Sequence, residues 1–196
     1  MALKQDRPEV VRNLLERGFD PNTPTADGLD ALYVALRDGS LKSAQVLIAW
    51  PKTNVDTRSP KDETPLMIAC LRGQSEIARE LLARGADVNK TGWTPLHYAA
   101  TGGHVDLMQL LLDDSAYIDA ASPNGTTPLM MAAKYGTEQA AQFLLDAGAD
   151  PTLKNQLGMS AADFANSAGR QELAQRLVKA ADAFAKRYRK PADSHR

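Results

Sequence analysis

A repeated Thr-Pro-Leu triplet constrains this chain more than any other feature of its sequence. Triplets begin at Thr64, Thr94 and Thr127, and weaker versions begin at Asp30 and Ser160, which gives successive intervals of 34, 30, 33 and 33 residues. Periods of roughly 20 to 50 residues are typical of proteins that stack one small unit many times, because a single unit cannot bury its apolar face alone. We therefore expect a linear array of similar units instead of one globular core.

Each unit carries the signals for two short antiparallel helices. A threonine such as Thr94 can cap a helix, and Pro95 in the first turn has a preset φ angle and lacks an amide hydrogen that the helix would leave unpaired. Gly103 follows at the expected chain reversal, before a stretch with helical spacing of apolar residues at 105–112. Isolated helices need about 12 to 15 residues to be even marginally stable, so neighbouring pairs must bury one another's apolar faces.

The most complete unit identifies a family resemblance. The segment from Gly92 to Ala100, Gly-Trp-Thr-Pro-Leu-His-Tyr-Ala-Ala, followed by Gly103-His104-Val105, resembles the ankyrin repeat signature. The likeness extends to about Ala181, with complete signatures near Asp62, Gly92 and Gly125 and weaker ones near Gly28 and Gly158. The resemblance implies an all-α, elongated and curved solenoid of helix-turn-helix units with β-turn fingers along one edge. It is similar to stand-alone bacterial ankyrin proteins, some of which are exported.

The pattern predicts five to six repeats, the first and last of which are partial or capping units. The expected domain covers residues 1–185, and a basic flexible tail follows at 186–196. The expected repeats are residues 1–26 (partial), 27–60, 61–90, 91–123, 124–156 and 157–185 (cap).

Two departures from the family pattern lie near the middle of the chain. Between Asn89 and Gly92 the sequence is about three residues shorter than the pattern, so we expect a clipped finger and a local notch that carries Trp93. In the preceding repeat, residues 50–53 replace the usual Gly-Ala turn, and Asp62 stands where glycine is expected. The exit of that repeat is therefore predicted to be irregular.

The two ends of the array also differ from the interior. Residues 7–17 align with a second helix, which leaves only residues 1–5 for a first helix that should be longer. We therefore expect the natural product to extend upstream of Met1, with room for a targeting segment. The helix predicted from Gln171 to about Lys186 outruns its counterparts, and a terminal cap needs a polar outer face. Residues that supply this face are Gln171, Glu172, Gln175, Arg176 and Lys179.

Composition excludes several function classes. No run approaches the roughly 20 apolar residues that cross a bilayer, so no membrane insertion is expected. Residues 1–185 carry 18 basic and 23 acidic groups, whereas residues 186–196 carry five basic groups and one acidic group. The basic tail is a candidate for contacts with nucleic acid, an anionic membrane or an import receptor, but an acidic body opposes the attraction to phosphate that supplies most non-specific DNA affinity. We expect no nucleic-acid binding.

The sequence predicts no catalytic, cofactor-binding or metal-binding residues. His97, His104 and His195 show no helical metal spacing, and the family resemblance assigns the first two to hydrogen bonds within and between repeats. The only cysteine, Cys70, follows Ala69 at a small-residue position, which favours a packed thiol over a reactive one. No nucleophile, base and orienting group are brought together, so the protein is predicted not to be an enzyme.

The side chains that are free from packing lie on the fingers and at the ends of the first helices, on the concave face. Interface hot spots are enriched in Trp, Tyr and Arg, which places the predicted centre at Trp93, Tyr135, Leu71 and Arg72. The predicted protein-binding residues are completed by Glu63, Thr101, Asn124, Lys134, Leu157 and Met159, with Arg37, Asp38, Lys61, Thr91, Thr126 and Ser167 beside them. The alternative is that Trp93 and Leu71 only stack between adjacent fingers.

The leading hypothesis is a non-enzymatic module, expected to be monomeric, that binds an unidentified protein on this concave face. One alternative is a structural scaffold that acts through the basic tail, and another is a cryptic metal-dependent enzyme. The chain as given is expected to be soluble and cytoplasmic, or periplasmic or secreted if a targeting segment precedes it.

Overall fold

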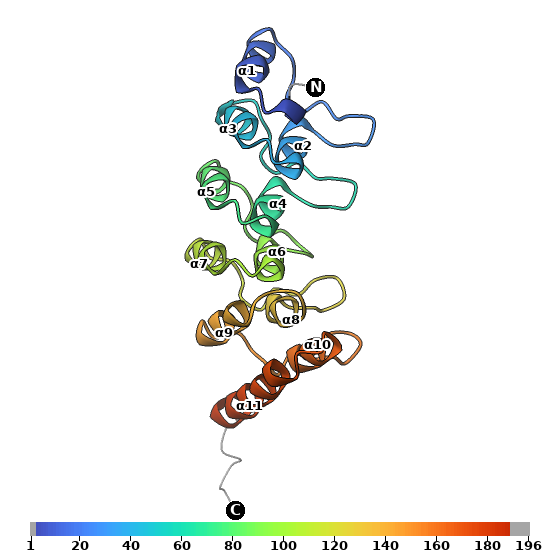
Figure 1. Cartoon of the computed structure of the whole chain (residues 1–196), viewed down its shortest axis with the longest axis vertical. Helices are drawn as coiled ribbons and strands as arrows, with labels where there is room; N and C mark the ends of the chain where they lie inside the picture. The colour runs from blue at the N-terminus through green and yellow to red at the C-terminus, as the bar shows by residue number, and fades with distance from the viewer. Residues whose placement is uncertain (1–2, 189–196) are drawn as a thin grey trace, which may run out of the picture.

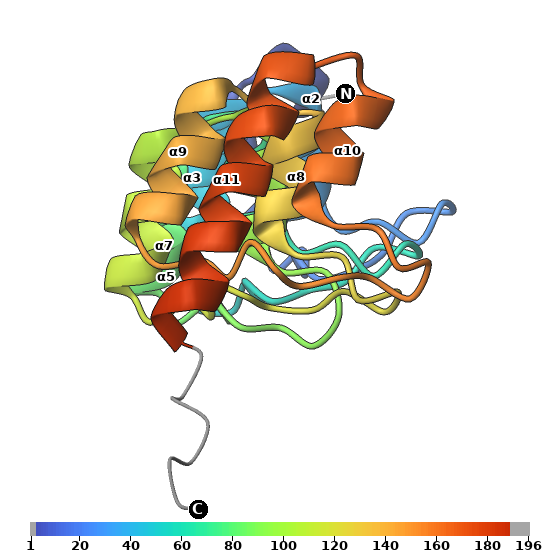
Figure 2. The same cartoon turned by 90° about the horizontal axis from the view of Figure 1, so that it is seen from below.

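The computed structural model describes residues 3–188, which form an elongated stack of helix pairs (Figure 1). The first helices of the pairs form one layer, the second helices form another, and finger loops project beyond the first layer (Figures 1 and 2). The first-helix layer comprises η1 (Leu3–Gln5), α2 (Ala31–Asp38), α4 (Pro65–Leu71), α6 (Pro95–Gly102), α8 (Pro128–Lys134) and α10 (Ala161–Ser167). The second-helix layer comprises α1 (Pro8–Glu16), α3 (Leu41–Ala49), α5 (Ser75–Ala83), α7 (Val105–Asp113), α9 (Glu138–Asp146) and α11 (Gln171–Tyr188).

The part of the chain that the structure describes contains helices and no strand, which confirms the predicted all-α solenoid. The first helices α4, α6 and α8 begin as expected, each with a threonine at the N-cap followed by proline. Thr64 Oγ1 accepts a hydrogen bond from the Met67 N–H at 3.3 Å, and Thr127 Oγ1 accepts one from the Met130 N–H at 3.4 Å. Each hydroxyl satisfies a backbone donor that the first helical turn leaves unpaired.

The core runs along the stack as one continuous seam. The leucine of each triplet is sealed between adjacent first helices, with 0% exposure at Leu66 and Leu96 and 1% at Leu129. A second row from the second helices, which includes Leu81 and Leu111 at 0% exposure, lines the same seam. Because each pair contacts mainly its neighbours, stability is shared along the array.

Close packing between repeats also depends on Gly136, whose φ angle is not in the left-handed region. A Cβ atom on Gly136 would lie 2.2 Å from the carbonyl oxygen of Ala100 in the preceding repeat. Backbone atoms cannot yield as a flexible side chain does, so only glycine fits between α8 and α9 at this point.

Asparagine and aspartate side chains at the bases of the fingers link one repeat to the next. Asp56 Oδ1 accepts the N–H of Asp87 at 2.9 Å, and Asn89 Oδ1 accepts the N–H of Tyr117 at 2.8 Å. A related bond joins Asp119 Oδ1 to the N–H of Asp150 at 3.1 Å. These bonds repeat with the period of the sequence and hold successive fingers in register.

The two ends agree with the sequence-based expectations in their described parts. Only the short η1 precedes α1 in the first unit, whereas α11 has 18 residues against nine for α9. The five polar residues that were predicted on the outer face of α11 are all exposed. This helix continues to Tyr188, and the remainder of the predicted basic tail, with His195, lies outside the described residues. Between residues 3 and 188, we find no helix with the length and apolar character needed to cross a membrane.

Candidate protein-binding surface

The finger before α6 is built differently from its neighbours. In the preceding finger the Ser59 N–H donates to the Glu63 carbonyl at 2.9 Å, and in the following finger the Ser122 N–H donates to the Thr126 carbonyl at 3.0 Å. Within the described residues, no equivalent bond closes the finger before α6. We call this segment, residues 89–93, the short finger.

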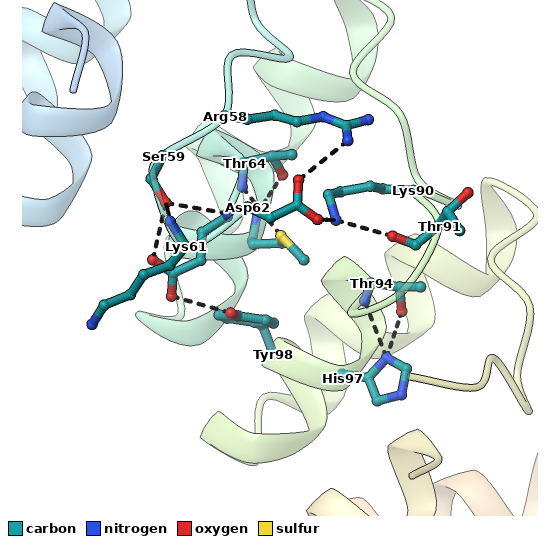
Figure 3. Close-up of polar contacts among 12 residues, drawn as sticks. Arg58, Ser59, Lys61, Asp62, Thr64, Lys90, Thr91, Thr94, His97 and Tyr98 are labelled. Atoms are coloured by element: carbon teal, nitrogen blue, oxygen red, sulfur yellow. Dashed lines mark hydrogen bonds and ion pairs between the residues drawn. The ribbon is translucent and has the colours of Figure 1, made fainter. Parts of the chain in front are cut away.

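A buried lysine fills the space behind the short finger. Lys90 is 2% exposed, and its ammonium group forms an ion pair with Asp62 of the preceding finger (Figure 3). The same ammonium donates to the Thr91 carbonyl at 3.0 Å, and Arg58 approaches the other oxygen of Asp62 at 3.2 Å. Hydrogen bonding to Lys90 is the main cause of the lowered pKa of Asp62. An exposed carboxylate therefore balances a buried ammonium.

This ion pair connects the two sequence departures, which the sequence presented as independent. Asp62 has a φ angle of 61°, in the left-handed region that glycine normally occupies. Aspartate is among the few residues that tolerate this conformation, and it brings a carboxylate that glycine lacks. The aspartate that replaces glycine in one finger thus neutralises the lysine buried behind the shortened finger that follows.

Trp93 lies at the end of the short finger and is half-buried. Its ring meets the ring of His97 edge to face, with centroids 5.1 Å apart and an interplanar angle of 75°. His97 Nδ1 accepts the Thr94 N–H at 3.2 Å, and Nε2 lies 2.9 Å from the Thr126 carbonyl of the next finger. Since Nδ1 is an acceptor, Nε2 carries the proton and donates it.

The environment of His97 keeps its ring neutral. Burial lowers its pKa from 6.5 to about 4, although hydrogen bonds to backbone carbonyls oppose this shift. The ring therefore forms a fixed, uncharged support beneath Trp93. His104 Nε2 lies 3.2 Å from the Leu71 carbonyl of the preceding repeat, so both histidines make the hydrogen bonds that the family resemblance implied.

Trp93 forms one wall of an open apolar pocket of about 200 Å³ on the first-helix face. Three predicted binding residues, Leu71, Trp93 and Thr101, are brought together here by α4, the short finger and α6. The full lining of this Trp93 pocket is Leu71, Trp93, His97, Tyr98, Thr101 and Met131. Thr101 is held by a hydrogen bond of 2.8 Å from its hydroxyl to the His97 carbonyl. The pocket can receive an apolar group from outside.

Sequence reasoning missed Tyr98 and Met131 as parts of this pocket. Both residues lie three positions after the proline that starts their helix, where Ile68 and Phe164 are the counterparts in α4 and α10. A large apolar residue at a constant helical register is typical of a core position. Both residues are half-buried beside Trp93, as Phe164 is at the same register in α10.

Glu63 has partners within the stack. Its Oε2 accepts the Tyr33 hydroxyl at 2.6 Å, and its Oε1 accepts the Tyr98 hydroxyl at 3.1 Å. Burial followed by hydrogen bonding to Glu63 raises the pKa of Tyr33 to about 12, and burial followed by the charge of Glu63 raises the pKa of Tyr98. Both phenols therefore remain donors at neutral pH. Glu63 joins α2 to α6 and fixes one wall of the pocket.

Arg72, Lys134 and Tyr135 lie at the ends of the helices that flank the pocket. Arg72 follows Leu71 as the C-cap of α4 and is exposed, while Lys134 is the last residue of α8. Lys134 Nζ lies 5.2 Å from the centroid of the Tyr135 ring, which is 58% exposed, and 5.7 Å from that of Phe164. These distances are within the range of cation–π attraction.

Three other predicted residues, Asn124, Leu157 and Met159, lie on the fingers that follow the pocket and do not line it. Asn124 is exposed, although its Oδ1 accepts the Thr126 N–H at 3.2 Å. Leu157 is 79% exposed, and Met159 is half-buried. The expectation for Thr126 is wrong, because this residue is buried and its carbonyl is the acceptor for His97.

Other reactive groups are sealed. Cys70 is fully buried, and burial raises the pKa of its thiol, which confirms a packed side chain. Among residues 3–188, no three His, Cys, Asp or Glu side chains are grouped in a way that could hold a metal ion. The hypothesis of a metal-dependent enzyme has no candidate ligand group in this part of the chain.

Comparison with known proteins identifies the stack. A family model described as Ankyrin repeats (3 copies) matches residues 1–92, 49–122, 81–155 and 116–187, which together cover almost the whole chain. The chain belongs to the ankyrin-repeat family. Ankyrin repeats generally mediate protein–protein interactions.

Three relatives from mammals share parts of this ankyrin array. Protein phosphatase 1 regulatory subunit 27 of mouse is 35% identical over 100 residues, which are 49% of this chain and 65% of the relative. Protein fem-1 homolog A-like of mouse is 36% identical over 111 residues, 55% of this chain and 17% of the relative. Human transient receptor potential cation channel subfamily A member 1 is 30% identical over 114 residues, 57% of this chain and 10% of the relative. This chain spans less than two thirds of each relative's length.

Proposed function

We propose that this ankyrin stack is a non-enzymatic module that binds another protein along its fingers and first helices, with the centre of contact at the Trp93 pocket. The observation that carries the proposal is an open apolar pocket walled by a half-buried tryptophan, on a face that the packing of the repeats does not use. Buried aromatic anchors in pockets dominate the binding energy of protein interfaces.

Exposed residues on either side of the Trp93 pocket support the same centre of contact. Tyr135, 58% exposed, and Leu71, 38% exposed, add apolar area on either side of Trp93. Arg72 lies next to Leu71, and an arginine side chain can form several hydrogen bonds with one partner. Membership of the family and similarity to a protein named as a regulatory subunit agree with a binding role.

Affinity capture with matched variants tests this function. The Trp93→Ala, Tyr135→Ala double variant should lose a partner that the wild-type protein captures from an extract of its source cells. Gln109→Ala combined with Gln142→Ala is the control, because both glutamines are exposed on second helices. Circular dichroism must show that all the proteins are folded.

The two variant pairs should therefore behave differently. A partner retained by the control and lost by the first pair supports the proposed centre. If every captured protein stays bound to the folded Trp93→Ala, Tyr135→Ala variant, the proposed centre is wrong.

A further inference from the structure

We propose that the Trp93 pocket recognises an extended segment that presents one large apolar side chain with an acidic residue two positions away on each side. This inference rests on the proposed function, and it names the chemistry of the partner. It depends on the size of the pocket, on the charges around it and on the spacing of the repeats.

The pocket has room for one large apolar side chain. An apolar protein cavity of roughly 150 Å³ accommodates a benzene molecule, and the Trp93 pocket measures about 200 Å³. Its walls offer the aliphatic surface of Leu71 and Met131 and the rings of Trp93 and Tyr98. The buried polar groups of His97 are already hydrogen-bonded, so nothing in the floor requires a polar ligand. A leucine, methionine or phenylalanine side chain fits this description.

The carboxylates near the pocket are neutralised or held by the protein itself. Asp62 is paired with Lys90 and Arg58, and both oxygens of Glu63 accept hydrogen bonds from tyrosines. Neither group needs a cation from a partner.

The cations beside the pocket have no carboxylate partner among the residues that the structure describes, although Lys134 also lies near the rings of Tyr135 and Phe164. In the described part of the chain, Arg72, Lys134 and Lys61 have no carboxylate within ion-pair distance. Arg72 adjoins the pocket residue Leu71, and Lys134 lies one helical turn after the pocket residue Met131. The helix-end rim of the pocket therefore carries positive charge on both sides.

The spacing of the repeats sets the register of the partner. Arg72 ends α4 and Lys134 ends α8, with α6 and the pocket between them (Figure 1). Neighbouring helices pack with axes about 8–10 Å apart, so each cation is roughly one such distance from the central anchor. In an extended segment, residues two positions apart share a face and lie about 6.6 Å apart. The long side chains of glutamate, arginine and lysine span the difference.

A displayed library of random nine-residue peptides, selected on the full chain, tests this inference. The expected result is enrichment of Leu, Met or Phe at one position, with Glu or Asp two positions before and after it. Enrichment of basic or purely polar peptides, or no enrichment beyond that seen with the Trp93→Ala variant, overturns the inference.

Two synthetic peptides then test the register at constant charge. The first carries Glu-Ser-Leu-Ser-Glu, and the second carries Ser-Glu-Leu-Glu-Ser, which places both acids on the face opposite the leucine. Fluorescence titration of Trp93 in a Trp50→Phe background should show tighter binding of the first peptide. Replacing its leucine with alanine should weaken binding about tenfold or more. Equal affinity for the two registers overturns the inference.

Two variants separate the apolar and charged contributions. Trp93→Ala should weaken binding of the first peptide about tenfold or more. Arg72→Glu should also weaken its binding. In addition, Arg72→Glu should reduce the preference for this peptide over an otherwise identical one with lysines in place of the glutamates. If Arg72→Glu leaves that charge preference unchanged, the charge argument is wrong.

The outcome can be distinguished from that of the proposed function. If the Trp93→Ala, Tyr135→Ala variant loses its natural partner but the peptides show no acidic preference, the binding face is correct and only this inference fails. If sedimentation shows a dimer of the free protein that Trp93→Ala dissociates, a second copy of the chain occupies the pocket and the inference is likewise overturned.

Discussion

Burial of His97 predicts that the stack loses stability in mild acid. The side chain is 0% exposed, and Nδ1 accepts the Thr94 N–H while Nε2–H donates to the Thr126 carbonyl. Burial disfavours the charged ring, and it lowers the pKa of His97 from 6.5 to about 4 although hydrogen bonds to backbone carbonyls oppose the shift.

The sign and size of the effect follow from linkage. As the pH falls through 6.5, the unfolded chain takes up a proton on this histidine, whereas the folded chain does not until about pH 4. The stability that the neutral ring contributes is thus fully present above about pH 6.5 and is lost as the pH falls from 6.5 to 4. Between pH 7 and pH 5, the free energy of unfolding should fall by roughly 2 kcal/mol from this group alone.

Urea titrations of the wild type and His97→Gln at pH 7 and pH 5 measure this loss. The variant should be less stable at pH 7, but its loss of stability between the two pH values should be smaller than that of the wild type by roughly 2 kcal/mol. His104 and His195 are present in both proteins and cancel in the difference. Four aspartates, Asp6, Asp62, Asp106 and Asp163, have pKa values below the ordinary 3.8 in the folded protein. The stability that they contribute is therefore lost mainly below pH 3.8, outside the pH range of the titrations. An equal pH dependence in the two proteins would refute the reasoning.

Two further predictions concern the packing of the stack and use the same denaturant titrations. Asp62→Asn keeps a residue that tolerates the left-handed conformation but leaves the buried ammonium of Lys90 facing a neutral amide, so it should cost roughly 1–3 kcal/mol. Lys90→Met should cost less, and the double variant should show a coupling of about 1 kcal/mol or more; additive effects would show that the ion pair is unimportant. Gly136→Ala should cost about 3 kcal/mol or more, because the new Cβ would lie 2.2 Å from a backbone oxygen. Gly148→Ala, where nothing lies within 4 Å but φ is 99°, should cost only about 1 kcal/mol, and equal losses for the two alanine variants would contradict this account.

The helix pairs could be predicted from the sequence because their signals are local. Thr94 and Pro95 define the start of a helix within two residues, and Gly103 marks its end with a φ angle of 73°. The stacking follows from the period, since short helices with apolar faces need neighbours. The ion pair between Asp62 and Lys90 could not be predicted in this way. These residues are 28 positions apart, and a repeat pattern shows that each is unusual without showing that their side chains meet.

The candidate site was only partly predictable for a similar reason. Leu71, Trp93 and Thr101 occupy positions that do not need to pack in an ankyrin repeat, and the sequence therefore indicated a surface role. Tyr98 and Met131 occupy a register at which first helices carry large apolar residues, so the pattern gave no sign that they line a pocket. The register alone does not decide whether such a residue is covered, because Ile68 is buried there whereas Tyr98 and Phe164 are partly exposed.

A regular repeat array presents nearly the same surface in every unit, so recognition at one place requires a unit that differs. Here the difference is the loss of about three residues from the short finger. At the end of this finger Trp93 lies against His97 and forms the pocket with the half-buried Tyr98 and Met131. Lys90 occupies the space behind the shortened segment, and Asp62 supplies the charge that makes its burial tolerable. The departures that weaken the match to the family pattern thus support one another, and Trp93, at the end of the shortened finger, forms one wall of the pocket.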